Sequence, residues 1–299
     1  MKVAAAPISW GVSELPAWGY RMTADRVLEE MKVVGFEATE LGPPGYLPDD
    51  PQICRELLDR HGLHLVGGFL ATILHEPRTL SDVVTRARTL AAAGAERLVL
   101  AAALAGNTYD SHHQLSPESW RVLSENLSAA QSIAEAYGLS VSFHPHVGTA
   151  IESDEQVSQL LARTDISLCL DTGHLVLGGI DPIDLAADAG SRINHVHLKD
   201  LNLKVATRLR ADELTYADAV REGLYQPLGQ GGLDIDAILS RLSDVGYEGW
   251  FVLEQDTALT AEPEPGSGPA TNVRLSLDYF RGITSANNTI ATSNGGSKL

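Results

Sequence analysis

The chain has 299 residues, and 39 Asp and Glu against 22 Lys and Arg give a formal net charge of −17. This charge opposes binding to nucleic acid or an anionic membrane, and no apolar run reaches the roughly 20 residues that span a bilayer. Hydrophobic residues make up 44% of the chain, enough for a large core, and the two cysteines are too few for a disulfide framework. We therefore expect a soluble, cytoplasmic protein that binds neither nucleic acid nor membrane.

Eight short apolar segments alternate with helical segments along the chain. Six of them follow closely after a glycine that ends a helical segment, a position that favours Gly because the backbone is left-handed there. These glycines are Gly35, Gly62, Gly94, Gly138, Gly190 and Gly246. The predicted strands are residues 3–8, 36–41, 63–66, 97–100, 139–143, 167–170, 193–198 and 250–253.

Strands that alternate with helices form a parallel sheet covered by helices. Eight such units predict an α/β fold of the (β/α)8 TIM barrel type in a single domain, which typically takes ~250 residues. A doubly wound open sheet is the alternative, but no Gly-rich phosphate motif follows an early strand. We place the barrel at residues 1–283, with a long loop at 199–232 that covers the site, a last helix at 272–281, and a flexible tail at 284–299.

Ionisable side chains lie at the C-terminal ends of the predicted strands, where a barrel of this type builds its site. They are Glu40 after the second strand, His144 and His146 after the fifth, Asp171 and His174 after the sixth, His195, His197 and Lys199 at the seventh, and Glu254 and Asp256 after the eighth. Two carboxylates and an imidazole that converge without a cysteine favour a hard or borderline divalent ion. Mn²⁺, Co²⁺ and Mg²⁺ suit such a site, and Zn²⁺ is a further candidate.

Three of these segments carry a family resemblance. Leu-Asp-Thr-Gly-His at 170–174, His-Val-His-Leu-Lys-Asp at 195–200 and Leu-Glu at 253–254 resemble the xylose isomerase-like TIM barrel superfamily of sugar phosphate isomerases and epimerases. Within it, His-Pro-His-Val-Gly-Thr-Ala-Ile-Glu at 144–152 is similar to the inosose dehydratase branch, as are Ile-Ser-Trp-Gly at 8–11 and Glu-Leu-Gly-Pro at 40–43. The resemblance covers the whole barrel and implies an enzyme of carbohydrate metabolism that uses one divalent metal ion, with manganese the first choice.

The resemblance also implies the ligands of that metal, which are Glu, Asp, His and Glu from the fifth to the eighth strand. Asp171, His197 and Glu254 match the last three. At the first position this sequence departs from the epimerase pattern: His144 stands at the matching place, and Glu152 follows eight residues later. We assign Glu152 as the fourth ligand, with His144 as the alternative.

The reaction that the resemblance implies is removal of the proton next to the carbonyl of a keto-sugar or keto-cyclitol, through an enediolate. Because imidazoles can protonate a departing hydroxyl, the histidines after the fifth strand favour elimination, as in an inosose (2-keto-myo-inositol) dehydratase. A ketose isomerase or 3-epimerase is the alternative. The expected catalytic residues are His144, His146, His174, Lys199 and Glu254, and the expected substrate contacts are Trp10, Glu40, His174 and Lys199.

Two other classes of protein are weaker interpretations. A DNA-repair enzyme similar to endonuclease IV shares the barrel, but it needs three metals and a cationic groove, which the net charge of −17 opposes. A non-catalytic binding protein does not explain an intact set of Asp171, His197 and Glu254. The expected partner is a neutral polyol or keto-sugar, because no Arg and Lys cluster lies at a predicted strand end. A homo-oligomer is compatible with this interpretation.

Overall fold

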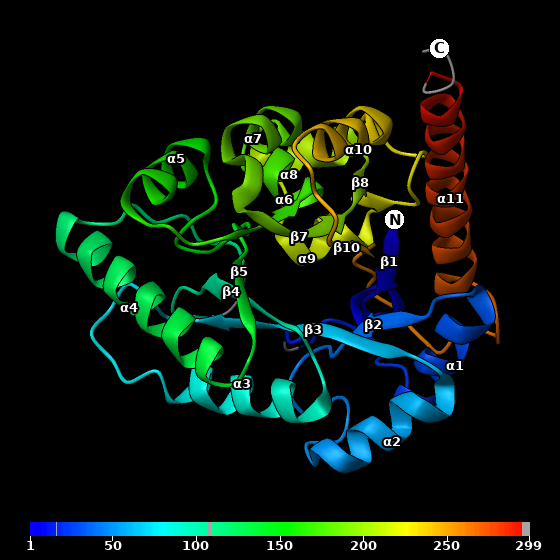
Figure 1. The fold of residues 1–299 in the computed structure, drawn as a ribbon, viewed down its shortest axis with the longest axis horizontal. Helices are drawn as coiled ribbons and strands as arrows, with labels where there is room; N and C mark the ends of the chain where they lie inside the picture. Colours follow the sequence, from blue (N-terminus) through cyan, green and yellow to red (C-terminus); the bar gives the residue numbers. More distant parts are fainter. Residues whose placement is uncertain (16, 107–108, 295–299) are drawn as a thin grey trace, which may run out of the picture.

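A computed structural model describes residues 1–15, 17–106 and 109–294, with backbone alone from residue 286. Over these residues eight parallel strands close into a barrel, and the helices lie around its outside (Figure 1). The order around the barrel is β1-β10-β7-β6-β5-β4-β3-β2. The predicted (β/α)8 fold is therefore confirmed.

The barrel strands lie close to the predicted ranges. They are β1 (Lys2–Ala5), β2 (Ala38–Glu40), β3 (His64–Thr72), β4 (Arg97–Ala102), β5 (Ser140–Phe143), β6 (Leu168–Asp171), β7 (Ile193–Leu198) and β10 (Trp250–Leu253). The first strand is shorter than the predicted 3–8, because Pro7 has no N–H to donate to a sheet and begins a short 3-10 helix, η1 (Pro7–Trp10). This turn carries residues 8–10 out of the barrel wall.

The helices alternate with the barrel strands, as predicted. They are α1 (Ala24–Val34), α2 (Pro51–His61), α3 (Ser81–Ala93), α4 (Pro117–Ala136), α5 (Asp154–Arg163), α6 (Thr172–Leu177), α7 (Pro182–Ala189), the 3-10 helix η2 (Gly190–Arg192), α10 (Ile235–Asp244) and α11 (Pro269–Asn294). All six glycines that were expected after helices have positive φ. Ser153 and Gln156 form a complete capping box at the start of α5.

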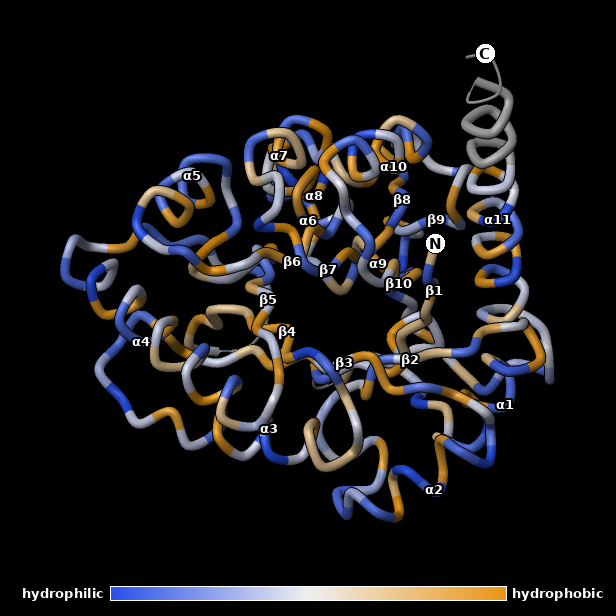
Figure 2. The backbone as a smooth tube through the Cα atoms, in the orientation of Figure 1, coloured by the Kyte–Doolittle hydropathy of each residue, from blue (hydrophilic) through white to orange (hydrophobic). Residues whose placement is uncertain are grey.

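The core has two layers. Along the helices in Figure 2, apolar and polar residues alternate, as expected for helices that bury one face. Their apolar faces join strand residues such as Leu98 and Leu100 in one large buried cluster. Small residues of neighbouring strands, including Ala4, Ala38 and Val252, form a separate buried cluster. The barrel interior is therefore packed with side chains, which leaves its C-terminal end to hold a site.

The segment expected as a long loop, 199–232, is folded. It contains the antiparallel strands β8 (Asp200–Leu201) and β9 (Tyr225–Gln226) and, between them, the helices α8 (Leu203–Arg210) and α9 (Tyr216–Arg221). Asn202 and Thr215 cap these helices with their side chains, so the segment satisfies its own backbone groups. Its apolar side chains pack in a second cluster with Trp18 and Tyr109.

The last helix is longer than predicted. Helix α11 continues past residue 281 to Asn294, because no proline interrupts the small and polar residues before Gly295. The flexibility of residues 284–299 stays a prediction. Within the described ranges, no helix combines the length and the apolar character needed to cross a bilayer.

Candidate active site at the C-terminal ends of the strands

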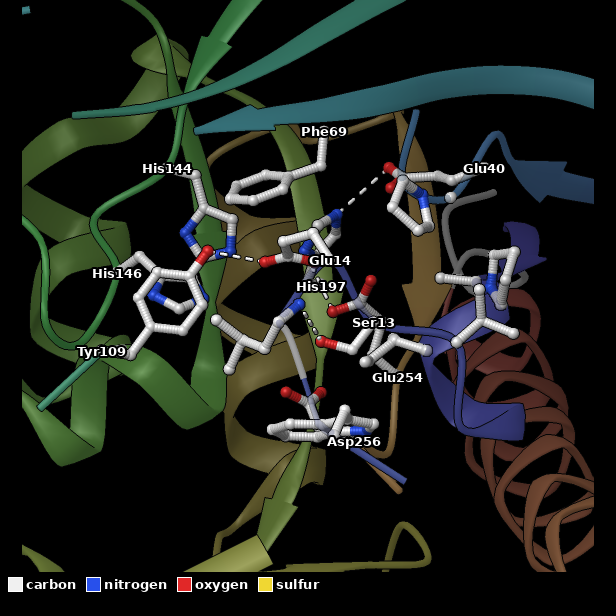
Figure 3. A pocket seen from close by; sticks show the side chains of 18 of the residues that line it. Ser13, Glu14, Glu40, Phe69, Tyr109, His144, His146, His197, Glu254 and Asp256 are labelled. Atoms are coloured by element: carbon white, nitrogen blue, oxygen red, sulfur yellow. Dashed lines mark hydrogen bonds and ion pairs between the residues drawn. The ribbon is translucent and has the colours of Figure 1, made fainter. Parts of the chain in front are cut away.

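A pocket with about 630 Å³ of open space lies at the C-terminal end of the barrel (Figure 3). Part of its charged lining comes from the ends of three strands, with Glu40 from β2, His197 and Lys199 at the end of β7, and Glu254 just after β10. The sequence therefore places these side chains together through the topology alone, because parallel strands end at the same edge.

Asp171, His197 and Glu254 converge beside this pocket. The Oδ2 atom of Asp171 lies 3.5 Å from Nδ1 of His197, and that nitrogen lies 3.3 Å from Oε2 of Glu254. Asp171 is fully buried, and its Oδ1 accepts hydrogen bonds from the backbone N–H groups of Gly173 and His174, both at 2.9 Å. Within the described residues, Asp171 Oδ2 and His197 Nδ1 have no hydrogen-bond partner. Their polar neighbours include each other, Glu254 and Lys199, which lie 3.3–3.5 Å away, so both atoms remain suited to bind a further group.

Glu40 fixes the orientation of the His197 ring. Its Oε1 accepts hydrogen bonds from Nε2 of His195 at 2.7 Å and Nε2 of His197 at 3.1 Å. Burial alone would raise the pKa of Glu40, but the neighbouring His197 and His195 outweigh it and hold that pKa well below its usual range. Glu40 is therefore an anion that keeps a proton on Nε2 of His197 and leaves Nδ1 free to bind a metal. Glu40 also lines the pocket, so its expected contact with substrate stays a prediction beside this positioning role.

His144 presents a second nitrogen to the same place. Its Nδ1 lies 2.7 Å from the carbonyl oxygen of Pro145, so Nδ1 carries the proton and Nε2 carries the lone pair. That Nε2 lies 3.4 Å from Oδ2 of Asp171. Oδ2 of Asp171 thus has Nε2 of His144 at 3.4 Å and Nδ1 of His197 at 3.5 Å, and each spacing suits two ligands of one ion with bonds of about 2.0–2.2 Å.

Glu152, the first choice for the fourth ligand, lies elsewhere. Its Oε1 contacts Nδ1 of His112 at 2.6 Å, and its Oε2 accepts from the N–H of Gly148 at 2.8 Å. The carboxylate lines a different pocket, together with Asp212. The chain does fold back after Gly148, but the two bonds hold the carboxylate on the outer side of that turn. Glu152 therefore does not join the cluster, and His144 stands next to Asp171 instead.

Lys199 is the cation of the site. Its Nζ lies 2.9 Å from Asp256, 3.1 Å from Glu254 and 3.3 Å from Asp171. Burial lowers the pKa of Lys199, but these carboxylates outweigh it and raise the pKa well above its ordinary value. Lys199 is therefore a fixed positive charge against which a substrate oxygen can lie.

His146 and His174 stack on each other, with ring centroids 3.7 Å apart. Burial, reinforced by nearby histidines and Lys199, lowers the pKa of both rings well below the ordinary value, so both are neutral. Nδ1 of His146 donates to the carbonyl of Val147 at 2.8 Å, which leaves the lone pair on Nε2. Nε2 of His174 lies 3.1 Å from Lys199 Nζ and accepts a hydrogen bond from it.

Trp10 was expected to contact substrate, but the structure places it in the core. Its side chain is fully buried, and its indole N–H donates to Oε2 of Glu30 on α1 at 2.9 Å. The 3-10 helix that starts at Pro7 turns the indole away from the barrel mouth. Trp10 is therefore not among the side chains that line the pocket.

Several pocket residues were missed by the sequence analysis. They are Glu14, Phe69, Tyr109 and Tyr216, which all line the pocket. Most of them lie in loops or in the segment between β7 and β10, where no periodic pattern marks a side chain that faces inward. Asp256, which the sequence placed at a strand end, also lines the pocket, and its Oδ2 accepts a hydrogen bond from Tyr216 at 2.7 Å.

Known proteins are similar to this chain along most of its length. The family model for the xylose isomerase-like TIM barrel matches residues 28–282. An inosose dehydratase of Geobacillus thermodenitrificans is 31% identical over 276 residues, which cover 87% of this chain and 91% of the relative. The rhizopine catabolism protein MocC of Rhizobium meliloti is 33% identical, over 96% of this chain and 89% of its own length.

A solved structure described as IOLI protein with a bound zinc atom superposes with a TM-score of 0.68 at 18% identity, over 96% of this chain and 99% of that one. At this identity, the superposition shows a shared fold only. The family model and the two relatives match this chain in sequence, and the matched residues include the strands that carry the site. The chain therefore belongs to the xylose isomerase-like TIM barrel family.

Proposed function

We propose that this protein is a divalent-metal-dependent dehydratase that removes water from a keto-cyclitol of the 2-keto-myo-inositol type. The observation that carries the proposal is the convergence of Asp171, His197 and Glu254 beside the pocket, where one donor atom from each lies within 4.8 Å of the others. The choice of reaction rests on the relatives named inosose dehydratase, which align along nine-tenths of their length. An isomerase or 3-epimerase with the same ligands is the alternative outcome.

The ligands of the metal would be His144, Asp171, His197 and Glu254. This set differs from the expected one, with His144 in place of Glu152. Burial raises the pKa of the nearby Cys169 thiol to about 11, so this sulfur stays protonated and is a poor ligand. Two carboxylate oxygens and two imidazole nitrogens suit Mn²⁺ best, and Co²⁺, Mg²⁺ or Zn²⁺ also bind such donors. When bound, the ion supplies electrophilic stabilisation of a substrate carbonyl and of the enediolate charge.

Lys199 and His146 would carry out the rest of the reaction. The ammonium of Lys199 stabilises negative charge on a substrate oxygen, since Asp256 and Glu254 hold it in place at 2.9 Å and 3.1 Å. Nε2 of His146 carries a lone pair and is placed to take the proton next to the carbonyl. The same imidazole then returns that proton to the departing hydroxyl, so that water leaves and the base is regenerated.

The charge of the pocket selects against anionic substrates. Glu14 and Asp256 line it in addition to the ligand carboxylates, and Lys199 is the one Lys or Arg among its described lining residues. A phosphate or carboxylate on the substrate would meet these negative charges without a compensating cluster of Arg or Lys. A neutral polyol ring with many hydroxyl donors is the better complement.

The test is to incubate manganese-loaded protein with 2-keto-myo-inositol in D₂O and to follow the products by NMR. The proposal expects loss of one hydroxyl from the ring, in the presence of metal only. Deuterium exchange next to the carbonyl with every hydroxyl retained would instead identify an isomerase or epimerase. An unchanged substrate, with a ketohexose panel equally unchanged, would contradict the proposal.

A further inference from the structure

Two loops that are far apart in the sequence meet over the pocket. Glu14 lies in the segment that follows η1, and Tyr109 lies in the segment between β4 and α4. The Tyr109 hydroxyl donates to Oε1 of Glu14 at 2.6 Å, and both side chains line the pocket (Figure 3). Neither residue belongs to the set proposed to hold the metal or to move the proton, so the metal chemistry does not explain them.

The backbone of Tyr109 is held in an unfavourable conformation. Its φ of 59° is left-handed, which costs conformational energy for a residue with a bulky side chain. Gly148, in the turn after β5, makes this placement possible, because a Cβ at that position would lie 2.2 Å from Cα of Tyr109. The turn that carries His146 thus accepts the backbone of Tyr109 at close range, and the Tyr109 and His146 rings lie 4.4 Å apart.

The surroundings leave the polar ends of this pair available to a ligand. Tyr109 is 5% exposed, and its ring also packs edge-on against Tyr216 at 5.9 Å. The phenol oxygen donates its proton to Glu14 and keeps lone pairs that can accept. A carboxylate accepts at about four positions, of which the bonds from Tyr109 and from the backbone N–H of Glu14 use two. The pair therefore presents two neighbouring acceptor oxygens.

We infer that Glu14 and Tyr109 form a hydroxyl-recognition pair, which selects substrates by two neighbouring ring hydroxyls that donate to the Glu14 carboxylate and to the Tyr109 phenol oxygen. The inference deepens the proposed function and rests on its polyol substrate. Adjacent hydroxyls of a cyclitol ring offer two donors side by side, which complements these two acceptors. A site built to bind a hydroxyl rejects the analogue that lacks it, because its own buried polar groups are then left unpaired.

Binding without turnover tests this inference. We would titrate manganese-loaded protein with myo-inositol and with its mono-deoxy analogues, by calorimetry or NMR, for wild type, Tyr109→Phe and Glu14→Gln. Tyr137→Phe is the matched control, since Tyr137 is exposed at the end of α4, and Glu135→Gln is the control for the carboxylate. Melting temperatures of all variants show that each is folded.

In wild type we expect at least one deoxy analogue to bind about tenfold more weakly than myo-inositol, or worse. In Tyr109→Phe and Glu14→Gln that penalty should fall to about twofold or less, while both controls keep it in full. An unchanged penalty in both pocket variants, or a wild type that discriminates among no analogues, would overturn the inference. A protein that shows this selectivity but does not turn over its substrate would contradict the proposed function and leave the inference standing.

Discussion

His197 is the residue on which the metal site depends, because each of its two ring nitrogens has a separate task. Nε2 donates to Glu40 at 3.1 Å, and Nδ1 faces Asp171 and Glu254. A ligating histidine whose second nitrogen bonds a carboxylate is held in one tautomer and one orientation. In the proposed site, Glu40 would therefore act on the metal through His197.

Glu40→Gln tests this role. The amide keeps the shape of the side chain but removes the charge that holds the proton on Nε2 of His197, so we expect metal affinity to fall about ten- to a hundredfold. Metal titration with a competing chelator measures the change. Glu37→Gln, an exposed residue just before the same strand, is the control and should bind metal as wild type does. Equal affinities in the two variants would show that Glu40 has no part in the site.

A second comparison separates His144 from Glu152. We expect His144→Ala to weaken metal binding by tenfold or more. Loss of a hydrogen-bond partner behind a ligand already costs about ten- to a hundredfold in metal affinity, and loss of a ligand should cost at least as much. Glu152→Gln should retain its metal, since its carboxylate bonds His112 and Gly148. Mass spectrometry of metal content in both purified variants gives the answer. Loss of metal from Glu152→Gln alone would restore the assignment made from the sequence.

The residues of the site differ in how well the sequence foretold them. Asp171, His197 and Glu254 follow apolar strands directly, so the topology brings them together without further information. Glu14 and Tyr109 could not be foreseen, because their positions depend on irregular loops and on a close approach at Gly148. The position of the Glu152 carboxylate could not be predicted for a related reason: the composition of a turn does not show to which side the side chain at its end points.

At the scale of elements, strand positions were predictable and the segment 199–232 was not. A glycine after each helix marks where the chain turns back into the barrel, and this signal survives in all six cases. In 199–232 the capping residues Asn202 and Thr215 were present in the sequence. The two helices were not predicted, because the segment is long and charged. They are short, and they bury their apolar faces against Trp18 and Tyr109 instead of against the barrel.

Removing α8 and α9 tests whether this folded segment covers the site. A short Gly-Ser linker in place of residues 203–222 can join β8 to β9, since the N–H of Asn202 already donates to the carbonyl of Leu224 at 2.8 Å. We expect the barrel to remain folded and turnover to fall about tenfold or more, because the loss of Tyr216 opens the pocket to water. Circular dichroism and steady-state rates check both parts. Unchanged kinetics would make the segment a passive insertion.

Across the whole molecule, metal binding and folding stability should be linked. The four ligands come from strands β6, β7 and β10 and from the turn after β5, so an ion bound to them ties together half of the barrel. An ion at a hundred times its dissociation constant stabilises the fold by about 2.7 kcal/mol. Removal of metal by a chelator should therefore lower the melting temperature by about 5 °C, and added Mn²⁺ should restore it. A melting temperature that changes with neither treatment would contradict the presence of a bound ion.

The most direct test of the metal-dependent dehydratase is Asp171→Asn. Asparagine keeps the oxygen that caps α6 through Gly173 and His174, so the variant should fold while it loses the negative ligand. Metal content and dehydration of 2-keto-myo-inositol are measured together for wild type, Asp171→Asn and the exposed control Asp244→Asn. We predict one divalent ion per chain and full activity in wild type and control, and in Asp171→Asn little metal and a rate reduced about a hundredfold or more. A metal-free Asp171→Asn enzyme that dehydrates the substrate at the rate of wild type would contradict the account.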